Sequence, residues 1–209
     1  MRVFTRRLGT GKVRLVTFCP DLGFFAGDVL DEVQSDETFA LTGEANQLPV
    51  LGSLTEFDLV NERSENFGLG NLAGKVWVAD FIFTTCAGPC PLMSQRMAAL
   101  QRTFRPQPQF RLVSFSVNPE YDTPEVLSDY GRQYGAARDR WTFLTGSPAD
   151  IQDVAVNGFH LGSVEEPIYH STLFTLVDGQ GRIRGYYDSN DAQTLESLVD
   201  HIQLLLTTL

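Results

Sequence analysis

The sequence is poor in cysteine and has no long apolar run. Three cysteines in 209 residues exclude a disulfide-dense scaffold, which needs several pairs in a short chain. No stretch of 18 consecutive apolar residues is present, so the sequence offers no clean membrane-spanning helix. Hydrophobic residues nevertheless make up 43% of the chain, which supports a buried core and argues against global disorder.

Positive charge is scarce and unevenly placed. The first 14 residues hold five bases and no acid, which leaves 11 bases against 26 acids in the other 195 residues. Nucleic acids and anionic lipid surfaces are bound through clustered lysine and arginine side chains. We therefore expect the main body of the protein to bind neither.

The first 47 residues differ from the rest of the chain. Basic residues precede a moderately apolar stretch, Leu15–Leu30, in the order found in export signals and membrane anchors. Asp21 and Asp28 interrupt this stretch, and a charge is costly at the centre of a bilayer. We predict that residues 1–47 form a poorly ordered tail and acidic linker, with a degenerate anchor or export signal as the alternative. Membrane association is then possible only through this segment. Cys19 is interpreted as an incidental thiol, with a lipidated or metal-binding cysteine as the alternative.

Alternating strand and helix patterns begin near residue 48. Lys75–Phe83 is a nearly continuous run of β-branched and aromatic residues, which is typical of a strand buried on both faces of a sheet. The other predicted elements are strands at Phe57–Val60, Phe110–Val117 and Arg140–Leu144, helices at Leu92–Phe104, Asp122–Tyr134 and from Ser147, a hairpin of Thr172–Val177 and Arg182–Tyr187, and a helix at Ala192–Leu206. This order predicts one α/β domain over residues 48–209, with a mixed central sheet and helices on both faces.

Cys86 and Cys90 lie between the predicted central strand and the helix that follows it, in the sequence Thr84-Thr-Cys-Ala-Gly-Pro-Cys-Pro91. Ligand sites in α/β sheets gather at the carboxyl ends of strands. A helix N-terminus favours thiolates, which makes both sulfurs better nucleophiles and metal ligands. A static disulfide and two inert buried thiols are the alternatives, although so short a loop gains little from a disulfide. We favour a functional pair, either redox-active or metal-binding.

Three histidines are available as partners for the cysteines. His170 precedes the predicted strand Thr172–Val177, which we expect to lie beside the strand ending at Phe83, so that His170 can approach the cysteine loop. His160 is interpreted as a loop residue, and His201 as a surface residue beside the apolar stripe of the last helix.

Two thiolates and one imidazole form a soft set of three ligands. Cu(I) accepts low coordination numbers and prefers sulfur, whereas zinc usually takes four ligands. Copper is therefore the metal we favour. Met93 and Met97 are one helical turn apart, and we interpret them as core residues, with soft copper ligation as the alternative.

Several segments together resemble the SCO/SenC family, copper-binding proteins that help assemble the binuclear copper centre of cytochrome c oxidase. They are Gly74–Met93, Ser116–Leu127, Trp141–Gly146, and His170 ahead of Leu173–Asp178. The resemblance runs from about Leu48 to the C-terminus. It implies a thioredoxin-like fold and copper, Cu(I) or Cu(II), bound by Cys86, Cys90 and His170. It also implies a client such as a cytochrome c oxidase subunit, and a membrane-anchored domain that faces the periplasm or an equivalent compartment.

The sequence departs from the family pattern in two places. Residues 1–30 are a weak anchor, and Tyr169 stands where the family often has an aspartate before its histidine. Such an aspartate would orient the histidine ligand.

Two functions remain open at the level of the sequence. The first is a copper metallochaperone, and the second is a thiol–disulfide oxidoreductase with Cys86 and Cys90 as its redox-active catalytic pair. A peroxidase of the peroxiredoxin type is excluded, because the pattern Pro-x-x-x-Thr-x-x-Cys precedes neither cysteine. His170 separates the two functions, since copper needs a third ligand and dithiol exchange does not.

Overall fold

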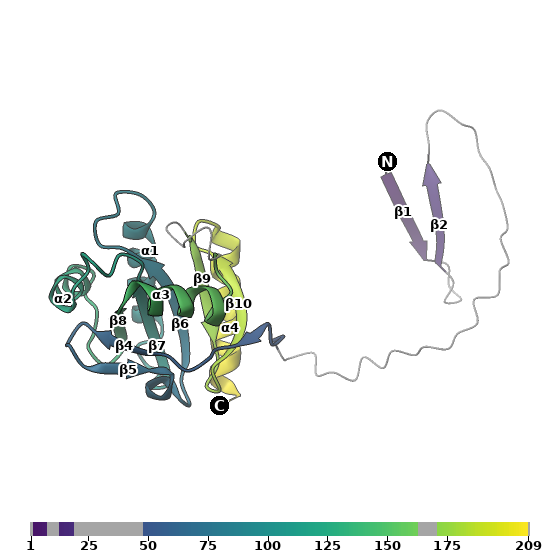
Figure 1. The fold of residues 1–209 in the computed structure, drawn as a ribbon. Coiled ribbons are helices and arrows are strands. Elements are labelled where there is room, and N and C mark those ends of the chain that lie inside the picture. The colour runs from purple at the N-terminus through teal and green to yellow at the C-terminus, as the bar shows by residue number, and fades with distance from the viewer. Residues whose placement is uncertain (1, 8–12, 19–47, 163–170, 209) are drawn as a thin grey trace. The chain divides into compact units, whose positions relative to one another are not determined.

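The computed structural model describes residues 2–7, 13–18, 48–162 and 171–208 (Figure 1). The chain divides into two compact units, Met1–Gly43 and Glu44–Leu209. In the first unit, β1 (Arg2–Arg7) and β2 (Val13–Phe18) form an antiparallel pair that was not predicted from the sequence. Cys19 lies outside the described residues, as does the rest of the predicted linker up to residue 47.

The second unit is built on one eight-stranded sheet with the order β3-β10-β9-β6-β7-β8-β4-β5. β6, β7 and β8 run parallel to one another, whereas β9 and β10 are antiparallel to their neighbours. The sheet is therefore mixed, as predicted, and the predicted hairpin is formed by β9 and β10. The strands are β3 (Gly52–Ser53), β4 (Asp58–Asn61), β5 (Asn66–Gly68), β6 (Val76–Ile82), β7 (Phe110–Ser116), β8 (Trp141–Thr145), β9 (Leu173–Val177) and β10 (Arg182–Asp188).

β6 is the central strand that its apolar sequence predicts. All seven of its residues are buried, because hydrogen-bonded strands flank it and side chains cover both of its faces. Successive side chains of a strand point to opposite faces. Accordingly, Val78 and Ile82 belong to one hydrophobic cluster, and Trp77 and Phe81 belong to the other.

Helices cover the two faces of the sheet (Figure 1). The helices α1 (Cys90–Thr103), α2 (Pro124–Gln133) and α4 (Ala192–Thr207) contribute to the cluster on one face. The cluster on the other face includes residues of η1 (Leu69–Leu72), α3 (Pro148–Asp153) and the π-helical turn η2 (Val154–Gly158). This arrangement confirms the predicted α/β fold with helices on both faces. No helix within the described ranges has the length and apolar character to cross a bilayer.

Strand direction brings distant parts of the sequence to the same end of the sheet. Because β6, β7 and β8 are parallel, the segments that follow them leave from one end, which we call the carboxyl end. β9 is antiparallel to β6, with Trp77 opposite Val177 and Ala79 opposite Thr175. The start of β9 therefore lies at the carboxyl end, close to the point where β6 ends.

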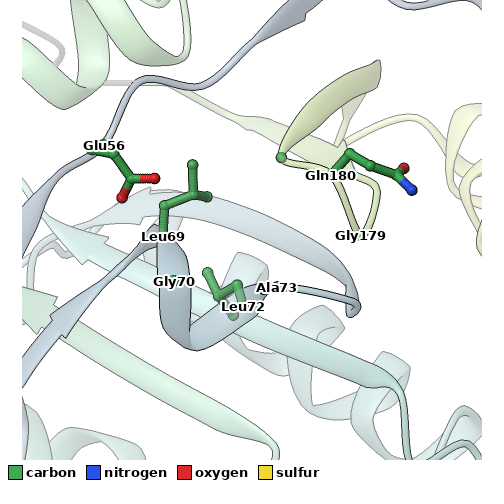
Figure 2. A pocket seen from close by; sticks show the side chains of 8 residues that line it. Glu56, Leu69, Gly70, Leu72, Ala73, Gly179 and Gln180 are labelled. Carbon is green, nitrogen blue, oxygen red and sulfur yellow. The ribbon is translucent and has the colours of Figure 1, made fainter.

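The turn between β9 and β10 lies at the opposite end of the sheet. A hollow of about 210 Å³ separates this turn from η1 (Figure 2). Leu69 and Leu72 line the hollow on one side and Gly179–Gly181 on the other, with Glu56 as its single charged side chain. Its lining contains no thiol or imidazole, whereas Cys86 and Cys90 both follow β6 at the carboxyl end.

Candidate metal and thiol site

A short loop joins β6 to α1 at the carboxyl end and carries both cysteines. α1 begins at Cys90, two residues earlier than predicted, and Pro91 occupies its first turn, where a missing N–H has no intrahelical partner to lose. Cys86 therefore lies in the loop and Cys90 lies at the helix N-terminus. This is the placement that the sequence predicts for the pair.

The two thiols are both free, but they differ in exposure. Cys90 is 4% exposed and belongs to the hydrophobic cluster beneath α1, whereas Cys86 is partly buried and packs against that cluster. The Gly88 N–H donates to the Cys86 sulfur at 3.4 Å. A reagent or a partner would thus meet Cys86 first.

Their pKa values shift in opposite directions. Burial is the largest influence on both thiols, and it disfavours the charged form. At Cys86, hydrogen bonds from the Cys90 thiol and from the Cys90 and Gly88 N–H groups outweigh burial and lower the pKa. At Cys90, burial and the neighbouring Cys86 sulfur raise the pKa to about 12. Hydrogen bonds near the start of α1 thus favour the thiolate of Cys86, whereas at Cys90 desolvation outweighs any stabilisation by the helix N-terminus.

A buried carboxyl group lies in the same half of the core. Asp80 belongs to β6, and strand alternation places its side chain on the face covered by α1. It is fully buried, and neither of its oxygens has a partner with ordinary hydrogen-bond geometry. Burial raises the pKa of Asp80 to about 7, against a smaller opposing effect of the Ser114 hydroxyl. Asp80 was not among the site residues predicted from the sequence, although a lone acid within the apolar run Lys75–Phe83 was an available signal.

A second buried carboxylate contacts the cysteine loop directly. Asp122 is fully buried and accepts hydrogen bonds from the Thr84 N–H, the Thr84 hydroxyl and the Ser116 hydroxyl. These donors come from the segment after β6 and from the end of β7. Asp122 was predicted from the sequence only as the start of a helix, and its contacts with the cysteine loop are a second role.

His170 and Tyr169 lie outside the described residues, within the segment 163–170. The described chain resumes at Ser171 and enters β9 at Leu173, at the carboxyl end of the sheet. Among the described residues, no group of three or more His, Cys, Asp and Glu side chains is arranged to hold a metal ion.

The other two histidines and the two methionines that were considered as ligands occupy three kinds of position. His160 is exposed after η2, with a positive φ of 55°. The His201 Nδ1 is 2.7 Å from the hydroxyl of Tyr187 on β10, so this histidine binds α4 to the sheet. Met93 and Met97 are at most 1% exposed, which confirms their interpretation as core residues.

A family model and an individual relative both match this chain, and they agree with each other. A family model described as SCO1/SenC matches residues 35–207. The SCO1 protein homolog of Bacillus subtilis (strain 168) is 31% identical over 170 residues, which cover 78% of this chain and 88% of that protein.

Solved structures agree with this relationship. A structure of BsSco, in which a disulfide switch was identified, belongs to the Sco family of cytochrome c oxidase assembly proteins. It aligns with a TM-score of 0.67 at 31% identity, over 77% of this chain and 98% of that chain. Bradyrhizobium japonicum ScoI with copper bound aligns with a TM-score of 0.61 at 20% identity, over 73% of this chain and 99% of that chain, which shows a shared fold. These likenesses confirm the thioredoxin-like fold, and the extent of the family match shows that the chain belongs to the SCO1/SenC family.

Proposed function

We propose that this protein is a copper metallochaperone that binds copper through Cys86, Cys90 and His170 and assists assembly of the copper centre of cytochrome c oxidase. The observation that carries the proposal is a pair of free thiols at the carboxyl end of the central strand, in a chain of the SCO1/SenC family. Copper-bound structures of proteins with the same fold support it.

The donor set suits copper better than other metals. Two sulfurs are preferred by Cu(I), and one imidazole completes a three-coordinate site without adding negative charge. Each thiol must lose its proton to ligate. The lowered pKa of Cys86 helps this step, and the raised pKa of Cys90 opposes it. Copper binding should therefore release a proton from Cys90 and become tighter as the pH rises.

Copper analysis of reconstituted protein tests the proposal. The full chain is reduced, loaded with Cu(I) under anaerobic conditions, desalted and analysed for bound metal. A competing Cu(I) chelator then ranks the affinities of the variants. His170→Ala should bind copper roughly 10- to 100-fold more weakly, by analogy with the loss of outer-sphere partners of metal ligands.

His160→Ala is the matched control, because His160 is exposed and belongs to the same part of the chain between η2 and β9. It should bind copper like the wild type. No bound copper in the wild type would refute the metallochaperone. An unchanged affinity in His170→Ala would remove this histidine from the ligand set.

A thiol–disulfide oxidoreductase is the second candidate, and the unequal thiols favour it. Cys86 is the more exposed cysteine and has the lower pKa, as expected of an attacking nucleophile. Its thiolate would attack one sulfur of a client disulfide and release the other client sulfur as a thiolate. Cys90, after losing its proton, would then attack Cys86 and release the second client thiolate. The client gains two electrons and the Cys86–Cys90 pair loses two.

Oxidation of the isolated protein tests this chemistry without a client. The peptide that carries both cysteines should lose about two daltons on oxidation and regain them with a reductant, because one disulfide forms per two protons and two electrons lost. The disulfide switch identified in BsSco supports such a pair. Thiols that stay free and unreactive in air would refute it.

We also propose that residues 48–209 are the copper-binding domain. This domain would face the periplasm or an equivalent compartment and be held to the membrane through the N-terminal segment. The family resemblance supports this location. Cell fractionation of a tagged full-length chain, with protease added to intact cells from which the outer barrier has been removed, tests it. Protection from protease would place the domain on the other side of the membrane.

A further inference from the structure

We propose that Asp122 is a positioning residue that holds the Cys86 end of the cysteine loop and thereby sets both the copper affinity and the disulfide stability of the pair. This inference rests on the proposed function, because it assigns a role in whichever chemistry the two thiols perform. It concerns a residue that touches neither sulfur in a hydrogen bond and acts through the backbone of Thr84.

The contacts of Asp122 link three elements. One carboxylate oxygen accepts the Thr84 N–H at 3.1 Å and the Ser116 hydroxyl at 2.6 Å, and the other accepts the Thr84 hydroxyl at 2.5 Å. Thr84 follows β6, Ser116 ends β7, and Asp122 itself precedes the helix α2, which Thr123 caps through Val126. One side chain therefore binds the start of the cysteine loop to the neighbouring strand and helix.

The chemistry of the contacts favours a carboxylate at this position. The Thr84 N–H can only donate, whereas the Thr84 and Ser116 hydroxyls donate to the carboxylate here but can also accept. An asparagine whose oxygen stays with the Thr84 N–H turns its N–H₂ group to a hydroxyl, which must then reverse its direction. It also lacks the negative charge that strengthens all three hydrogen bonds. A fully buried carboxylate is itself costly unless it is hydrogen-bonded. Replacing Asp122 by its neutral isostere therefore weakens specific loop contacts.

The two ends of the cysteine loop are held differently. Cys90 is fixed by the first turn of α1 and by the hydrophobic cluster around it. Cys86 has a backbone hydrogen bond from its N–H to the Phe83 carbonyl at 3.2 Å and the contact of its sulfur with Gly88. Thr84 is two residues from Cys86, so its attachment to Asp122 limits how far the Cys86 sulfur can move from the Cys90 sulfur.

Loosening this attachment should weaken every process that needs the two sulfurs together. Outer partners that orient metal ligands are worth roughly 10- to 100-fold in metal affinity, and we expect at least a tenfold loss of Cu(I) affinity in Asp122→Asn. The equilibrium constant for disulfide formation should fall by a similar factor. A tenfold fall corresponds to a reduction potential that is about 30 mV less negative.

The experiment compares Asp122→Asn and the milder Thr84→Val with a matched control, all in the full chain. Thr84→Val removes one hydroxyl donor but keeps the Thr84 N–H contact and the charge of Asp122. The control is Asp178→Asn, because Asp178 is also a buried carboxylate (4% exposed) that accepts backbone N–H groups, those of Gln180 and Arg182. It lies in the turn at the opposite end of the sheet. Copper affinity is measured with a competing Cu(I) chelator and the potential against a glutathione buffer.

Asp122→Asn should change both quantities, and Thr84→Val should change both in the same direction by less. Asp178→Asn should lower stability while the copper affinity and potential of its folded fraction stay at the wild-type values. Two results together would overturn the role of Asp122. The copper affinity and the reduction potential of Thr84→Val would equal those of the wild type, and those of Asp122→Asn would equal those of Asp178→Asn. If Asp122→Asn does not fold, an unchanged potential in Thr84→Val alone overturns it. Failure of the wild type to bind copper or form a disulfide is a separate outcome, which contradicts the proposed function instead.

Discussion

The buried Asp80 should make this protein less stable as the pH rises through neutrality. In the unfolded chain its carboxyl ionises near the ordinary value of 3.8, whereas in the folded protein burial keeps it protonated up to about pH 7. Between these values the folded state holds a proton that the unfolded state has lost, so the free energy of unfolding falls as the pH rises. The contribution is fully present below the unfolded pKa and is lost once the pH exceeds the folded pKa.

The size of the effect follows from the pKa difference. A shift from 3.8 to about 7 corresponds to about 4 kcal/mol at 1.36 kcal/mol per pKa unit. Asp80→Asn has no ionisable group at position 80, so this part of the pH dependence of stability disappears. Relative to the wild type, the free energy of unfolding of the variant should increase by about 4 kcal/mol from about pH 4 to about pH 8.

Urea unfolding under reducing conditions measures this difference. Trp77 and Trp141 are buried, and their fluorescence follows the loss of the core. Subtracting wild type from variant at each pH removes the contribution of every other titrating group. Asp200→Asn, on the exposed side of α4, is the control for the same change of side chain outside the core. Parallel profiles for wild type and Asp80→Asn would refute the reasoning.

Three further outcomes follow from burial and packing. Limited alkylation of the reduced protein should label Cys86 well before Cys90, which peptide mass spectrometry resolves; equal labelling would contradict their unequal exposure. Met97→Ala should destabilise the fold by about 2–5 kcal/mol in urea unfolding, because Met97 is fully buried; a loss within measurement error would show that the cavity collapses. Gly131→Ala should also destabilise, by about 1–3 kcal/mol, since a Cβ there would lie 2.8 Å from the Phe143 ring; a variant as stable as wild type would show that the ring moves aside.

Much of the fold could be predicted from local sequence patterns. The apolar run Lys75–Phe83 predicted a strand that is buried on both faces, and β6 is that strand. The turn at Asp178–Gly181 and the strand patterns beside it predicted the hairpin of β9 and β10. These features depend on residue type and spacing over a few positions, which a sequence displays directly.

The site could be predicted only in part, because its remaining features depend on burial. The positions of Cys86 and Cys90 follow from the loop sequence, but their opposite pKa shifts depend on the burial of Cys90 and on the hydrogen bonds that Cys86 accepts from Cys90 and Gly88. The contact of Asp122 with Thr84 spans 38 positions, and no local pattern reveals it. The start of α1 was misjudged by two residues because prolines at 89 and 91 obscure where the helical hydrogen bonds begin.

The two outer strands of the eight-stranded sheet bear on how the protein avoids self-association. β3 has two residues and β5 has three, and short outer strands offer few unpaired N–H and C=O groups to another chain. β3 lies against β10, which has seven residues. β3 pairs only with Arg182 and Ile183 of β10, and the Leu51 N–H donates to the Ile183 carbonyl. The Leu48 and Pro49 carbonyls accept hydrogen bonds from the buried Arg184. A chain shortened past residue 53 would leave these groups of β10 without their partners, so the segment that enters the domain is part of its folded structure and such a chain should be less stable.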